Sequence, residues 1–78
     1  MPVRFKRFDV RHLLASGVEV FPEIRKRADA IRPGEGLAVV APFLPSPLIE
    51  RLRTEGFVAR VESLPDGSWV AYFWREAL

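Results

Sequence analysis

Two kinds of hydrophobic spacing alternate along this chain and indicate a mixed α/β domain. Apolar and polar residues roughly alternate over 4–10 (RFKRFDV), which predicts a strand with Phe8 and Val10 facing a core. Between residues 21 and 31, apolar residues recur at intervals of three, four and three, which predicts one face of a helix. The continuous apolar run LAVVA at 37–41 predicts a central strand flanked by neighbours.

Prolines and glycines separate these segments. Residues 11–17 show neither spacing and are predicted to form a loop. Pro33-Gly34 is expected to end the first helix. Pro42 is expected to end the central strand, because proline has no N–H to donate to a neighbouring strand.

A second helix and a hairpin follow. Ser46 is a good candidate for the N-cap of this helix, and Gly56 for the left-handed residue that ends it. Two further strands, 57–63 and 68–75, are joined by the turn LPDG at 64–67.

The element order is therefore β-α-β-α-β-β, within a single domain of residues 1–78. Right-handed crossovers place both helices on one side of the sheet. The expected fold class is α+β: a two-layer sandwich with a four-stranded mixed sheet, whose last strand runs antiparallel to its neighbours. The other sheet face is left open. The residues expected to be mostly buried are Phe8, Phe21, Ile24, Ile31, Val39, Leu48, Leu52, Phe57, Trp69 and Phe73.

Composition narrows the function classes. The 78 residues are 49% hydrophobic and include no cysteine, which excludes disulfides and thiol chemistry. Twelve basic and ten acidic side chains give a net charge of +2, too small to indicate nucleic-acid binding by itself. No signal peptide or membrane-spanning run is visible, so a cytoplasmic protein that does not bind a membrane is expected.

Several short motifs, in order and spacing, resemble a known group. Phe8-Asp9-Val10-Arg11 with His12-Leu13 is similar to the L-D-x-R-G-L start of the TusA/SirA-like sulfur-carrier fold, and IRPGE at 31–35 is similar to its P-G-E turn. The chain more closely resembles the bacterial family called domain of unknown function 2249. The segments that carry this resemblance are Ala41-Pro42-Phe43, Pro47-Leu48, Gly56-Phe57, and Asp66-Gly67-Ser68-Trp69 with Phe73. The resemblance covers about residues 8–74 and implies the same β-α-β-α-β-β sandwich.

One departure from the sulfur carriers changes the expected chemistry. Those proteins carry a cysteine in a C-P-x-P motif at the start of the first helix, where the helix dipole stabilises a thiolate or persulfide. The corresponding stretch here is GVEVFP at 17–22, without a thiol. Persulfide relay is therefore excluded for this chain.

A first candidate site is a ligand- or anion-binding mouth between the two helix N-termini, formed by Arg11, His12, Phe43 and Ser46. Arg11 also has a simpler interpretation, as a local ion pair with Asp9. The single histidine, with no cysteine, is a poor basis for a metal site, and no serine stands in a nucleophile motif. We therefore expect that the chain is not an enzyme and that it binds neither a metal ion nor a cofactor.

A second candidate site is the open face of the sheet. Strand alternation predicts that Val58, Arg60, Val70, Tyr72 and Trp74 form a patch there. Aromatic side chains with arginine are typical of contact surfaces. Trp74 has an alternative, which is packing against Ala77 and Leu78.

The expected function is a small non-catalytic binding or adaptor module that contacts a protein partner or a second copy of itself. A small-ligand or anion-binding domain is one alternative. An RNA-binding domain is another, although no RNP-type motif is present and the basic residues are scattered.

Overall fold

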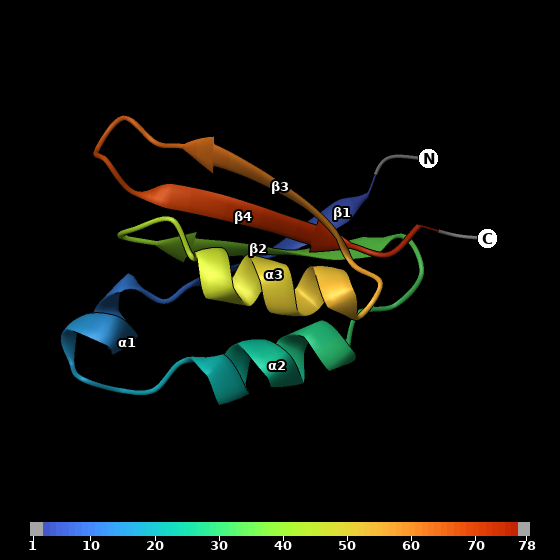
Figure 1. Ribbon diagram of the computed structural model, residues 1–78, viewed down its shortest axis with the longest axis horizontal. Coiled ribbons are helices and arrows are strands. Elements are labelled where there is room, and N and C mark those ends of the chain that lie inside the picture. Colours follow the sequence, from blue (N-terminus) through green and yellow to red (C-terminus); the bar gives the residue numbers. More distant parts are fainter. Residues whose placement is uncertain (1–2, 77–78) are drawn as a thin grey trace.

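A computed structural model of the protein describes residues 3–76, and Figure 1 shows the order of its elements. The strands are β1 (Arg4–Asp9), β2 (Glu35–Ala41), β3 (Val58–Ser63) and β4 (Trp69–Trp74). The helices are α1 (Arg11–Ala15), α2 (Phe21–Asp29) and α3 (Ser46–Thr54). The predicted mixed fold is confirmed, with one short helix added.

The four strands form a single mixed sheet in the order β1-β2-β4-β3. β1 pairs with β2 in parallel, while β4 lies between β2 and β3 and is antiparallel to both. The last strand therefore lies inside the sheet, and the prediction that it runs antiparallel to its neighbours is confirmed. β2 and β4 are central, and β1 and β3 are the two edges.

Both long helices cover the same face of the sheet (Figure 1). Ile24 and Ala28 of α2, and Leu48 and Leu52 of α3, pack into one cluster with the inward residues of β2 and β4. Two polar contacts also join the helices: an ion pair between Arg25 and Glu55, and the Arg51 guanidinium over the Phe21 ring. Within residues 3–76, no helix covers the opposite face.

The segment predicted to be a loop, 11–17, contains the helix α1 instead. Its start is stabilised by a carboxylate from β1, because Asp9 Oδ1 accepts the backbone N–H of Arg11 at 3.0 Å. The Leu14 N–H then donates to the Val10 carbonyl at 2.9 Å. A single turn of helix shows too little hydrophobic periodicity to be recognised in the sequence.

The two ends of α3 behave differently. The prediction that Ser46 is the N-cap is wrong, because Pro45 occupies that position. No side chain forms a capping hydrogen bond at the start of α3. Ser46 already belongs to the first turn, so its hydroxyl is not placed to accept the N–H groups there. Gly56 is confirmed as the left-handed stop, with φ of 93°. The Phe57 N–H donates to the Leu52 carbonyl at 3.1 Å, which brings two core side chains together as the helix ends.

Most of the predicted core is confirmed. Six of its residues are buried, namely Ile24, Val39, Leu48, Leu52, Phe57 and Phe73. Phe8, Phe21 and Ile31 are half-buried and pack against the cluster. Trp69 is half-buried as well but does not pack against this cluster, so its predicted core position is wrong. Its strand neighbours, Ala41 and Ser63, are too short to cover an indole.

Among the helices of the described residues, none is long and apolar enough to cross a membrane.

Candidate functional site

One end of the sheet brings together several segments that are far apart in the sequence. The carboxyl ends of β1 and β2 lie there, together with α1, the first turns of α2 and α3, and the β3–β4 turn (Figure 1). The predicted ligand-binding residues Arg11, His12, Phe43 and Ser46 all come from segments at this end. The structure separates them into different environments.

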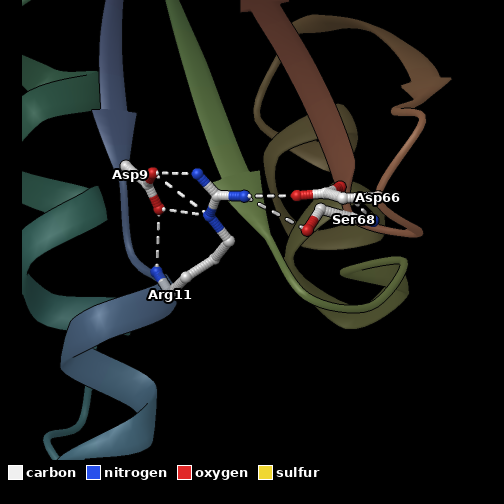
Figure 2. A network of polar contacts seen from close by, with 4 residues as sticks. All are labelled: Asp9, Arg11, Asp66 and Ser68. Atoms are coloured by element: carbon white, nitrogen blue, oxygen red, sulfur yellow. Dashed lines mark hydrogen bonds and ion pairs between the residues drawn. The ribbon is translucent and has the colours of Figure 1, made fainter.

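Arg11 is the centre of a polar network that spans the end of the sheet (Figure 2). Its Nε donates to Asp9 Oδ1 at 3.0 Å, and its Nη2 donates to Asp9 Oδ2 at 2.6 Å. On the other side, Nη1 donates to Asp66 Oδ2 at 3.0 Å and to the Ser68 hydroxyl at 3.3 Å. Arg11 thus ties the end of β1 to the β3–β4 turn across β2.

The network also organises the turn itself. Asp66 Oδ1 accepts the backbone N–H of Ser68 at 2.9 Å, and Ser68 is buried. The side-chain hydrogen bond from Arg11 lowers the pKa of Asp9 from its ordinary value of 3.8 to about 2. The pKa of Asp66 is lowered as well, first by the hydrogen bond from the Ser68 backbone. Both carboxylates are therefore ionised at neutral pH.

This arrangement does not favour an anion at Arg11. Carboxylates and a hydroxyl already occupy its Nε, Nη1 and Nη2 groups. The two ionised carboxylates already balance the positive charge of Arg11, so the cluster has no net attraction for a further anion. The ion-pair interpretation of Asp9 and Arg11 agrees with this geometry, and Arg11 acts as a structural clamp.

Next to this network lies an apolar hollow of about 190 Å³, between α1, α2 and the start of α3. Every residue that lines it is apolar, including Leu14, Phe21, Leu48 and the exposed Phe43. Of the four predicted ligand-binding residues, only Phe43 contributes to it. The hollow fits an uncharged group, since it offers nothing to pair with a charge.

His12 and Ser46 lie outside this hollow. His12 is exposed on α1, where its carbonyl accepts the Ser16 hydroxyl at 3.0 Å. Ser46 is exposed at the start of α3. Within residues 3–76, no group of histidine and carboxylate side chains is arranged to hold a metal ion.

The open face of the sheet carries the second candidate site, and strand register defines it. Trp74 pairs with Val58, Tyr72 with Arg60, and Val70 lies opposite Glu62. Paired residues point to the same face, so the five predicted residues share one side of the sheet. The alternative packing of Trp74 against Ala77 and Leu78 lies outside the described residues.

Phe5 also belongs to this face, although sequence reasoning did not assign it there. Its ring makes edge contacts with Tyr72 and Trp74, with ring centroids 4.9 and 5.8 Å apart. β2 lies between these strands, and Gly36 is the β2 residue that pairs with both Phe5 and Trp74. A Cβ at Gly36 would come within 2.5 Å of the Phe5 ring, so the missing side chain is what lets the ring cross β2.

The five predicted residues differ in how much they offer a partner. Val70 is 5% exposed and is covered with Ala38 and Val40 in a small apolar cluster. Tyr72, Trp74 and Val58 are half-buried, and Arg60 is exposed. We use the term aromatic patch for Phe5, Tyr72 and Trp74 with the flanking Arg7 and Arg60. Arg7 lies on this face because it pairs with Ala38, which in turn pairs with Tyr72.

Comparison with known proteins gives one family and no individual relative. The model of the family described as "Uncharacterized conserved protein (DUF2249)" matches residues 7–75. No curated protein and no solved structure matches the chain.

Proposed function

The chain belongs to the DUF2249 family, and from that premise we propose that it is a small non-catalytic adaptor module that binds a protein partner through the aromatic patch. The match covers nearly all of the described residues, so the sandwich is the family's domain. The family's description assigns no activity, and the support for this function comes from the surface of the sheet.

The observation that carries the proposal is the Phe5–Tyr72–Trp74 cluster on the sheet face that no helix of the described residues covers. Phe5 is 39% exposed, and the three rings surround a shallow hollow that Arg60 and Glu62 also line. Pre-ordered aromatic side chains that are partly exposed contribute strongly to protein interfaces, because they bury a large apolar area at little cost in side-chain entropy.

The charges around the patch indicate the chemistry of the partner. Arg7 and Arg60 share a row of the sheet with Tyr72. Within residues 3–76, neither arginine forms an ion pair. The partner we propose therefore presents an apolar side chain flanked by carboxylates.

The test uses the chain as bait in lysate of the organism that produces it, followed by mass spectrometry and by affinity measurement with the purified partner. Trp74→Ala removes the largest ring of the patch. We expect it to weaken binding by about 2 kcal/mol, roughly thirtyfold, with the fold unchanged by circular dichroism. Phe43→Ala is the matched control, since Phe43 is an exposed ring away from the patch.

Capture that persists unchanged with Trp74→Ala, or a variant that binds less only because it unfolds, contradicts the proposal. Single-stranded RNA is the other occupant that aromatic rings with arginine accept. Capture that disappears on ribonuclease treatment would assign the patch to RNA instead of a protein.

The non-catalytic part of the proposal is supported by composition. We infer that the chain shares the TusA/SirA-like arrangement without its sulfur chemistry, because the β-α-β-α-β-β order is present and cysteine is absent. The stretch that would carry the sulfur, at 17–22, contributes Val20 and Phe21 to the apolar hollow instead. The helix start that could activate a thiol is lined with hydrocarbon.

We propose a small apolar ligand in this hollow as a second candidate function. Its volume of about 190 Å³ and wholly apolar lining are suited to a single ring or a branched alkyl group. Toluene is expected to shift the NMR signals of Leu14 and Phe43, whereas sulfate is not. Shifts produced by sulfate at Arg11 and His12 would restore the anion-binding alternative.

A further inference from the structure

The edge strand β3 has an unpaired side that is complementary to itself. It lies at the end of the sheet order, and its last four residues, 60–63, are exposed. An exposed edge presents a row of backbone N–H and C=O groups that another strand can pair with. Natural edge strands are usually protected against such pairing. The side chains along β3 therefore decide which strand can pair with its edge.

The hairpin determines which β3 backbone groups face outward. The Leu64 N–H donates to the Ser68 carbonyl at 2.7 Å, which makes Leu64 and Ser68 a hydrogen-bonded pair. Such pairs alternate along an antiparallel ladder, so Arg60 and Glu62 direct their backbone groups toward β4. Ala59, Val61 and Ser63 therefore direct their N–H and C=O groups away from the sheet.

We propose that two copies of this chain associate through antiparallel pairing of β3 with β3, centred on Val61. In this register, Val61 pairs with Val61 of the second copy, and Ala59 pairs with Ser63, so the outward backbone groups meet as hydrogen-bonded pairs. The two sheets join into one, with both aromatic patches on the same continuous face.

The charges on β3 favour this register over the two registers that are shifted by two residues. Centring on Val61 places Arg60 opposite Glu62 of the second copy, and Glu62 opposite Arg60. These are the non-hydrogen-bonded positions, where side chains of paired strands lie closest. A shift of the second copy by two residues in either direction would instead set Arg60 against Arg60, or Glu62 against Glu62.

The opposite edge, β1, does not have this property. Its six residues, RFKRFD, include three cations, Arg4, Lys6 and Arg7, and the one carboxylate, Asp9, is already paired with Arg11. Self-pairing would therefore bring cations together, and charged side chains of this kind are a common protection of sheet edges. On β3 the two charges balance, and the neighbouring Val61 is a β-branched side chain that is 37% exposed. A second copy would cover it.

The occupant is therefore a second copy of the chain, related by a two-fold axis. This inference goes beyond the proposed adaptor function, because it uses the strand edge instead of the aromatic patch. Pairing of one strand and its flanking side chains buries a small area, so we expect a weak, concentration-dependent dimer.

The test is sedimentation equilibrium of the purified chain over a wide concentration range. Arg60→Glu turns both charge pairs repulsive and should weaken the dimer about tenfold, as should Glu62→Arg. The double variant Arg60→Glu/Glu62→Arg exchanges the charges and should restore dimerisation. An equimolar mixture of the two single variants should form mixed dimers.

Val61→Lys should abolish the dimer without touching the aromatic patch, and Trp74→Ala should leave the dimer unchanged. A wild-type chain that stays monomeric at the highest concentration would overturn the proposal. So would a dimer that the two single charge reversals do not weaken. Because Trp74→Ala tests the adaptor function and Val61→Lys tests the dimer, failure of one is distinguishable from failure of the other.

Discussion

Single residues of this chain have roles that depend on contacts between distant segments. Arg11 is the clearest case: two carboxylates and a buried serine from separate segments meet on one guanidinium. Gly36 acts by lacking a side chain, because the Phe5 ring occupies the space that a Cβ would need. Neither role is visible from residue type alone.

At this scale, Asp9→Asn tests the Arg11 clamp. The folded carboxyl has a pKa of about 2 against an ordinary value of 3.8, so its stabilising effect is complete above about pH 4. That effect is lost as the pH falls from 4 toward 2, because the unfolded chain is protonated first. We expect the variant to lose about 1–2 kcal/mol at pH 7, a value reduced for solvent screening of the partly exposed side chain.

Urea unfolding at pH 7 and pH 2 measures this difference, and the gap between wild type and Asp9→Asn should narrow at the lower pH. Asp29→Asn is the control, because Asp29 forms a single exposed ion pair with Arg25 on α2. It should change stability by less than about 0.5 kcal/mol. A gap that stays the same at both pH values would show that Asp9 acts by something other than its charge.

Each element of the fold is stabilised by a different set of contacts. α3 depends on one apolar stripe, with Leu48 and Leu52 against the sheet and the Gly56 stop that turns the chain into β3. The β3–β4 hairpin depends on its turn, where the Gly67 N–H donates to the Leu64 carbonyl at 3.0 Å and Arg11 holds Asp66. α1 depends on its neighbours, since a single turn is not stable alone.

The α3 stripe can be tested by truncation. Leu52 is 0% exposed at the centre of the core, so Leu52→Ala should lower the free energy of unfolding by about 2–5 kcal/mol through lost contacts and a cavity. Glu50→Ala, on the exposed side of the same helix, should change it by less than about 0.5 kcal/mol. Chemical denaturation measures both, and equal midpoints for the two variants would mean that the helix face is wrongly assigned.

The whole molecule is a sheet with a protected centre and two exposed edges. Val39 and Val40 of β2 are 0% exposed, and β2 is paired on both sides. β3 packs on α3 at one face, but its outer edge is open. Local opening should therefore be easiest at the edges and hardest in the centre.

Hydrogen exchange followed by NMR tests this gradient. The amides of residues 38–40 should exchange only by global unfolding, and the outward amides of Ala59, Val61 and Ser63 should exchange fastest in dilute solution. If the chain dimerises through β3, raising its concentration should protect these three amides and leave the outer amides of β1 unchanged. Central amides that exchange as fast as edge amides would contradict the strand order.

The sequence by itself determined the four strands, the two longer helices and most of their faces, because those depend on local spacing. Alternation along β4 separates Phe73, in the core, from Tyr72 and Trp74, on the open face, and β3 register agrees with that assignment. The turn at 64–67 and the stop at Gly56 follow from residue chemistry within a few positions. The order β-α-β-α-β-β then limits the fold to one sandwich.

Tertiary structure alone decided what happens between distant segments. α1 forms where a loop was expected, beside an Arg11 whose guanidinium reaches Asp66, 55 residues away. Phe5 joins the aromatic patch because the strand order places Gly36 between it and Trp74. Of the predicted ligand-binding residues, Arg11 joins a polar clamp and Phe43 lines an apolar hollow, while His12 and Ser46 belong to neither. Local spacing predicts which way a side chain points from its strand, but long-range pairing decides which side chains it meets.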